Sequence, residues 1–100
     1  FGLTGAVPAE IGRLSALRTL NLCVNELTSL PAEIGQLTLL EGLNLYRNQL
    51  TSVPAEIGQL TSLTWLHLCS NRLTSVPAAI RELRAAGCNV FLDYGVTFDE

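Results

Sequence analysis

One spacing of leucine and asparagine runs through the stretch Leu40-Glu41-Gly42-Leu43-Asn44-Leu45-Tyr46-Arg47-Asn48-Gln49-Leu50. The same spacing occurs at an equal interval before it, over residues 17–27, and after it, over residues 63–73. A second segment, Leu-Thr-Ser-Leu-Pro-Ala-Glu-Ile-Gly-Gln-Leu at 27–37, recurs at 50–60 with Val53 in place of the fourth residue, and recurs with more changes at 73–83. Self-similarity at a fixed period is the sequence signature of a repeat architecture. We therefore divide the chain into units at about 3–26, 27–49, 50–72 and 73–95.

Each unit predicts one short strand and one short helical segment. Leu43 and Leu45 alternate with a period of two, so both point to one side of a strand, and successive strands should pair in parallel. Pro31 stands where a helix can begin, and Ile34, Leu37 and Leu40 follow at a spacing of three. The sequence therefore predicts an α/β fold. It is a right-handed solenoid with a parallel sheet on the concave side and short helices or 3₁₀ segments on the convex side.

Composition sets the broad class. The chain has 100 residues, enough for one domain spanning 1–100, with 48% apolar and only 15% charged residues. That balance excludes a disordered chain, and the apolar runs are too short to cross a membrane. The net charge is −3 and no lysine is present, so we expect no nucleic acid and no membrane among its partners.

The leucine and asparagine pattern resembles the leucine-rich repeat, and three in-phase copies make the resemblance specific. The repeating unit is similar to arrays of the plant intracellular Ras-group type and to arrays of unicellular eukaryotes. The first unit, from Leu3 to Pro8, looks more like the unit of plant receptor-kinase ectodomains. The resemblance implies a curved solenoid that binds proteins on its concave side.

Asparagine recurs once per unit, at Asn25, Asn48 and Asn71. An amide side chain offers two donors and an oxygen that accepts two hydrogen bonds. Placed at the bend after each strand, it can satisfy backbone groups that the turn leaves unpaired. We therefore predict a structural asparagine ladder at these positions rather than a binding site.

The two ends of the repeat array differ. The first unit begins at Leu3 without a preceding strand, so its apolar flank is expected to lack an N-terminal cap. Two alternatives stay open: the natural protein is longer and this is a piece of it, or the open end pairs with another copy in a homo-oligomer. At the other end, residues 78–86 favour a better helix than their counterparts, Gly87 is a natural C-cap, and 89–93 read as a fourth strand. Residues 78–100 are therefore predicted to form a C-terminal cap.

The cysteines and the single histidine do not indicate a disulfide, a metal site or a catalytic group. Cys23 and Cys69 occupy equivalent places two units apart, about 10 Å by strand spacing, which is too far for a disulfide. Neither a metal-ligand cluster nor a partner for His67 is apparent, so we expect no metal, no cofactor and no catalysis. Free thiols favour a cytoplasmic, reducing location.

The concave face carries the candidate binding residues. If the leucines point inward, the alternate positions point outward and form an exposed aromatic cluster flanked by arginine, a composition typical of interface hot spots. The predicted contact residues are Trp65, His67, Tyr46, Phe91, Asn44 and Arg47. We expect Trp65 to be the anchor, since it offers the most apolar area.

The predicted function is non-catalytic protein–protein interaction or scaffolding, of a signalling kind. Three alternatives remain open. The chain could be a self-assembling structural repeat, or the recognition segment of a longer signalling enzyme. A weaker alternative is a small-ligand pocket around Trp65 and His67, which a shallow curve disfavours.

Overall fold

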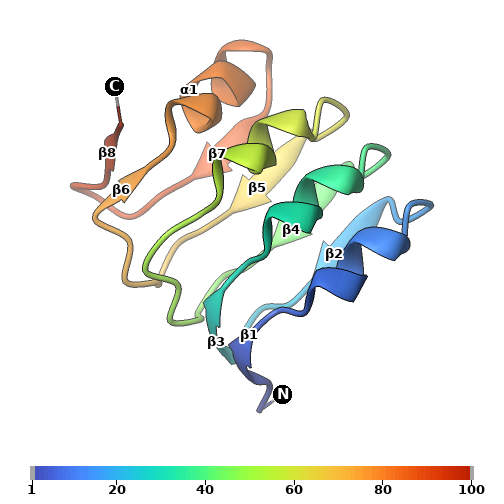
Figure 1. Cartoon of the computed structure of the whole chain (residues 1–100). Coiled ribbons are helices and arrows are strands. Elements are labelled where there is room, and N and C mark those ends of the chain that lie inside the picture. The colour runs from blue at the N-terminus through green and yellow to red at the C-terminus, as the bar shows by residue number, and fades with distance from the viewer. Residues whose placement is uncertain (1, 100) are drawn as a thin grey trace.

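A four-stranded parallel sheet forms one side of the protein (Figure 1). The computed structural model describes residues 2–99; Phe1 and Glu100, at the ends of the predicted domain and cap, lie outside that range. The sheet contains β2 (Thr19–Asn21), β4 (Gly42–Asn44), β5 (Trp65–His67) and β7 (Asn89–Phe91), in that order. Each strand comes from a different unit, as the repeat in the sequence predicts.

The register of this sheet aligns equivalent residues of each unit. Leu20 pairs with Leu43, Leu43 with Leu66, and Leu66 with Val90. The side chains of Leu43 and Leu66 are completely buried, because they point from the sheet into a core shared with the neighbouring units. The predicted inward orientation of the leucines is confirmed.

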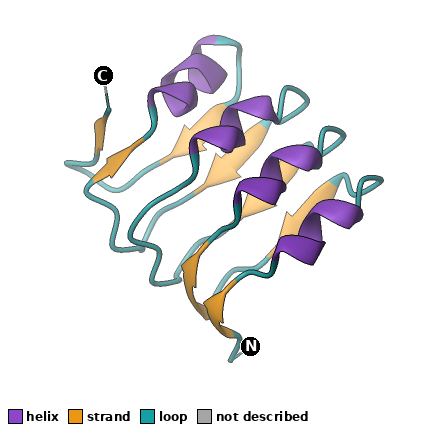
Figure 2. Cartoon of the chain, in the orientation of Figure 1, coloured by secondary structure: helices purple, strands orange, loops and turns teal. Residues whose placement is uncertain are grey.

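Short helical segments cover the opposite side of the core (Figure 2). Three are 3₁₀ helices: η1 (Ala9–Arg13), η2 (Ala32–Gln36) and η3 (Ala55–Gln59). Each starts directly after a proline, which lacks the N–H that a helix start would leave unpaired. Each also contains a glycine, which disfavours a full α-helix.

The glycine in these segments is required by a close approach between units. A Cβ atom at Gly35 would lie 2.6 Å from the carbonyl oxygen of Glu56 in the next unit. Any larger residue would push η2 and η3 apart. In the fourth unit, glycine is absent and the segment is a true α-helix, α1 (Ala78–Ala85), followed by Gly87 in the left-handed region at φ 108°.

Four further strands were not predicted from the sequence. β1 (Thr4–Ala6) pairs in parallel with β3 (Glu26–Ser29), and β6 (Ser75–Val76) pairs in parallel with β8 (Thr97–Phe98). β1, β3 and β6 each precede a helical segment, and β8 lies near the C-terminus beside β6 (Figure 1). The sheet strand predicted at 89–93 is shorter than expected, since β7 ends at Phe91.

The asparagines join the units through hydrogen bonds. Asn48 is buried, and its Oδ1 accepts the N–H of Leu27 at 3.0 Å. Its Nδ2 donates to the carbonyl oxygens of Leu22 at 2.9 Å and Leu45 at 3.2 Å. Asn71 repeats this geometry one unit later, with the N–H of Leu50 as donor. The side chain thus replaces backbone pairing that the turn cannot supply.

The first rung of this ladder, Asn25, makes all of its hydrogen bonds within its own unit. The Oδ1 of Asn25 accepts the N–H of Leu3 at 3.0 Å, and its Nδ2 donates to Leu22 and Cys23 of its own unit. Asn25 is half-buried, whereas Asn48 is buried. The difference follows from position, since only Asn48 lies between two complete units.

The C-terminal end of the array is closed by side chains. Arg84 Nη2 donates to the carbonyl oxygen of Val90 at 2.9 Å, on the strand that ends the sheet. The guanidinium groups of Arg81 and Arg84 lie 5.1 and 5.3 Å from the ring centre of Phe98. The carboxylate of Asp93 accepts the N–H of Ser70 at 2.8 Å. In earlier units the equivalent N–H groups, those of Val24 and Arg47, donate to a backbone carbonyl oxygen of the following unit.

Candidate interaction surface

The outward side of the four-stranded sheet is the candidate site, and we call it the open sheet face. Its side chains alternate with the inward leucines along each strand. They form three rows across the units: Thr19, Gly42, Trp65 and Asn89; Asn21, Asn44, His67 and Phe91; and, just beyond the strands, Cys23, Tyr46, Cys69 and Asp93. No helix or loop of residues 2–99 is seen over this side of the sheet (Figure 2).

Three rings form a continuous aromatic row on this face. The ring centres of Tyr46 and His67 are 4.9 Å apart with the planes tilted by 45°. The ring centres of His67 and Phe91 are 5.2 Å apart with a tilt of 38°. These separations lie in the range of favourable ring contacts. Phe91 nevertheless remains 48% exposed, so the row presents apolar area to solvent.

Trp65 lies beside this row and packs over the neighbouring strand. A Cβ atom at Gly42 would lie 2.4 Å from the indole carbons Cε2 and Cζ2 of Trp65. The indole therefore occupies the space that a side chain on β4 would otherwise fill, and Trp65 is half-buried. The sequence predicted Trp65 on this face, but it did not indicate that the indole packs on Gly42.

The middle row makes local hydrogen bonds as well as facing outward. Asn44 Oδ1 accepts the N–H of Tyr46 at 3.0 Å, and Asn21 makes the same contact with Cys23 at 3.1 Å. At the equivalent position His67 Nδ1 accepts the N–H of Cys69 at 3.4 Å. The imidazole thus takes the place that an amide oxygen holds in the two preceding units.

Arg47 stands just past β4 in an unusual backbone conformation. Its φ is 58°, and the equivalent residues Val24 and Ser70 have φ values of 57° and 59°. The turn requires a left-handed residue here so that Asn48 can reach both units. The Arg47 side chain is exposed, and no ion pair to it occurs within residues 2–99. Arg47 is therefore an exposed cationic residue that directly follows Tyr46, just beyond the strand.

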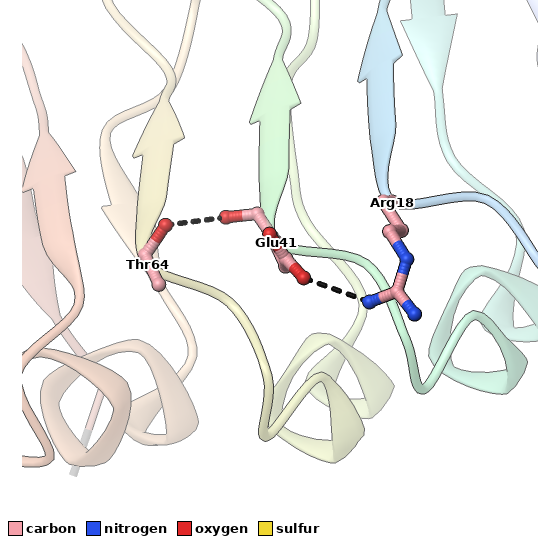
Figure 3. A network of polar contacts seen from close by, with 3 residues as sticks. All are labelled: Arg18, Glu41 and Thr64. Atoms are coloured by element: carbon pink, nitrogen blue, oxygen red, sulfur yellow. Dashed lines mark hydrogen bonds and ion pairs between the residues drawn. The ribbon is translucent and has the colours of Figure 1, made fainter.

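A polar network marks the edge of this face where the strands begin (Figure 3). Arg18 Nη1 lies 2.9 Å from Glu41 Oε2, and Thr64 Oγ1 donates to the Glu41 carbonyl oxygen at 2.9 Å. Both partners of the ion pair are well exposed, so it contributes on the order of 0–1 kcal/mol to stability. The network aligns three units and leaves the centre of the face free of ion pairs.

The cysteines are free thiols. Burial, and secondly the negative charge of Asp93, raise the pKa of the Cys69 thiol. Burial also raises the pKa of Cys88, against a smaller lowering by Arg84. Both shifts favour the neutral thiol over the thiolate. Within residues 2–99, no group of three or more His, Cys, Asp or Glu residues could hold a metal ion.

These features define a repeat solenoid with an uncovered sheet face. A family profile described as a leucine-rich repeat region matches residues 4–85, and the chain belongs to the leucine-rich repeat family. The α/β solenoid expected from the sequence is confirmed. Members of this family are commonly interaction modules and are generally non-catalytic.

Solved structures of leucine-rich repeat proteins resemble the chain over most of its length. A Leptospira interrogans leucine-rich repeat protein is 41% identical with a TM-score of 0.76, over 89% of this chain and 22% of its own. The ectodomain of the Arabidopsis thaliana receptor kinase GASSHO1/SCHENGEN3, solved with CASPARIAN STRIP INTEGRITY FACTOR 2, is 35% identical with a TM-score of 0.81, over 91% and 11%. PEPR1 in its structure with AtPEP1 is 29% identical with a TM-score of 0.81, over 97% and 14%.

The chain spans less than a quarter of the length of each of these three proteins. A comparison with curated proteins found no match. Among residues 2–99, no helix has the length and apolar character needed to cross a membrane.

Proposed function

We propose that the protein is a non-catalytic recognition module that binds a protein or peptide partner on the open sheet face. The aromatic row carries this proposal. Tyr46, His67 and Phe91 stay in contact with one another while offering apolar area to solvent. Exposed aromatic area on a rigid element is the feature that interface hot spots share.

The surroundings of the row favour a polypeptide over a small molecule. Trp65 is held against Gly42, so it loses little conformational freedom on binding. Arg47 supplies an exposed guanidinium at the border, which suits a carboxylate or a backbone carbonyl of a partner. Asn44 uses its Oδ1 within its own turn and keeps its amide donors available.

The relatives support the same class of partner. The ectodomain of GASSHO1/SCHENGEN3 was solved in complex with CASPARIAN STRIP INTEGRITY FACTOR 2, and PEPR1 was solved with AtPEP1. By analogy, an extended peptide laid across the four strands is the ligand that this face would accept. Because those relatives include receptor kinases, the second candidate is that the chain is the recognition segment of a longer signalling enzyme.

A differential pull-down tests the proposal. The wild type is compared with the Tyr46→Ala/Phe91→Ala variant and with the control Leu39→Ala, whose exposed leucine lies outside the open sheet face. We expect partners held by the wild type and the control to be lost from the double variant. For a purified partner, removing two hot-spot side chains should weaken binding by about 30-fold or more. Equal binding by the folded double variant would refute the proposal.

The proposed location is a reducing compartment such as the cytoplasm. All three cysteines are free thiols, and Cys23 and Cys69 stand on units separated by β4. Fractionation of cells that express the complete tagged gene product tests this. Recovery in the secreted fraction would contradict it.

A further inference from the structure

One hydrogen-bond acceptor per unit on the open sheet face is directed at the backbone of the chain itself. Each accepts a backbone N–H just beyond a strand of the sheet, at distances from 2.8 to 3.4 Å. In chain order, these acceptors are Asn21 Oδ1, Asn44 Oδ1, His67 Nδ1 and the carboxylate of Asp93. Part of the accepting capacity of this face is therefore already used within the chain.

The donors of the same face are not used in this way. An asparagine side chain also carries two N–H donors, and within residues 2–99 the Nδ2 atoms of Asn21 and Asn44 donate no hydrogen bond. The Nε1–H of Trp65, which lies 2.6 Å from where a Cβ atom of Gly42 would stand, donates none either. Within residues 2–99 no buried side-chain nitrogen lacks a partner, so these unused donors reach solvent.

The charges around the face show a similar imbalance. The charge of Arg18 is paired with Glu41 at the edge where the strands begin, whereas Arg47, directly after Tyr46, is exposed and has no ion pair within residues 2–99. Asp93 is the carboxylate of the third row, and it stands two units further on, beyond β7. Acidic residues also lie in the helical segments on the opposite side of the core: Glu10, Glu33, Glu56 and Glu82. An uncompensated positive charge is thus left beside β4.

We propose that the ligand of the open sheet face is an acidic peptide segment with one large apolar side chain. Its carboxylate and backbone carbonyl groups accept hydrogen bonds from Arg47 and the amide donors, and its apolar side chain covers the aromatic row beside Phe91. Repulsion by Asp93 keeps the acidic end over β2 and β4, which sets the direction of the peptide. This inference rests on the proposed function and adds the chemistry of the ligand to it.

The other polar side chains of the face are compatible with such a ligand. They carry groups that both donate and accept hydrogen bonds, so they do not reverse the excess of donors. These residues are Thr19, Tyr46 and Asn89.

Selection from a phage-displayed library of random short peptides tests the inference. The wild type should enrich peptides that combine Asp or Glu with an aromatic or large aliphatic residue, relative to the unselected library. A synthetic peptide of the most enriched sequence should bind Arg47→Glu at least about 10-fold more weakly than the wild type, because like charges then face each other. Arg13→Glu is the matched control, since it makes the same charge change on η1, on the opposite side of the core. The control should bind this peptide like the wild type.

Arg47→Asn is the second variant, because asparagine tolerates the left-handed backbone that φ 58° requires. It should weaken binding of the same peptide, but less than Arg47→Glu does, and circular dichroism melting establishes that all variants fold. Enrichment of no peptide, enrichment without acidic residues, or equal weakening by Arg13→Glu overturns the inference.

The double variant separates this inference from the proposed function. If the enriched peptides lack acidic residues but no longer bind Tyr46→Ala/Phe91→Ala, the inference fails and the proposed function stands. If the peptides bind the double variant as tightly as the wild type, both fail. Sedimentation velocity on the wild type covers the remaining occupant. A dimer that the double variant abolishes would assign the face to a second copy of the chain and overturn the inference.

Discussion

Replacing Asn48 by alanine tests the asparagine ladder most directly. The side chain makes three hydrogen bonds, one accepted from Leu27 N–H and two donated to the carbonyl oxygens of Leu22 and Leu45. In Asn48→Ala, the Leu27 N–H loses its acceptor inside the protein. Both carbonyl groups lose a donor as well, although each can retain other partners through its second lone pair.

The expected loss of stability follows from this count. The Leu27 N–H, left buried without a partner, should cost about 1–3 kcal/mol, and the loss of one of two hydrogen bonds at each carbonyl oxygen adds to this, so we expect a total of about 3 kcal/mol. For a domain of this size, that corresponds to a fall in Tm of about 15 °C. It is also a large part of the about 5–15 kcal/mol by which typical domains are stable.

Asn25→Ala is the matched control, because the same residue type holds the same place in the first unit. Its contact with Leu3 is exposed and its amide reaches no earlier unit. Water can replace these bonds, so we expect a loss of about 1 kcal/mol. Urea unfolding followed by circular dichroism measures both values. Equal losses in the two variants, or a loss for Asn48→Ala of under about 1 kcal/mol, would refute the ladder as an energetic link between units.

Two further substitutions test the turn and the open sheet face. Gly42→Ala puts a methyl group in the space of the Trp65 indole. The fluorescence emission of this single tryptophan should therefore shift to the red, and the free energy of unfolding should fall by about 1–3 kcal/mol. An unchanged emission maximum would contradict the packing of Trp65 on Gly42. Val24→Gly removes a β-branched side chain from a backbone position with φ 57°, and should stabilise the fold by about 1 kcal/mol by removing backbone strain. A lower urea midpoint than that of the wild type would argue against strain at this turn.

The sequence predicted the structure best where a local feature of the backbone or core depends on a single type of residue. The repeat period indicated which leucines share a row, and Leu43 and Leu66 are paired and buried as predicted. Pro31 and the spacing of Ile34, Leu37 and Leu40 predicted a short helix or 3₁₀ segment, and η2 is a 3₁₀ helix. Alternation, helix starts and glycine content act over a few residues, so they can be recognised without knowledge of the fold.

The sequence was less informative about the second set of strands. β3 and β6 arise in segments for which the alternation of leucines predicts no strand. Their pairing depends on how closely the curve of the solenoid brings neighbouring units together on that side. The same applies to Arg84, which closes the edge of β7 at Val90 by a contact that spacing alone does not reveal.

The leucine spacing by itself determined the family, the order of the parallel strands and the inward row of the core, because these follow from periodicity along the chain. Only the tertiary structure decided how the exposed residues meet. It brought Tyr46, His67 and Phe91 into one aromatic row, set Trp65 on Gly42 and left Leu14 uncovered. Such contacts depend on side-chain direction and on the distance between units, which arise only when the whole chain has folded.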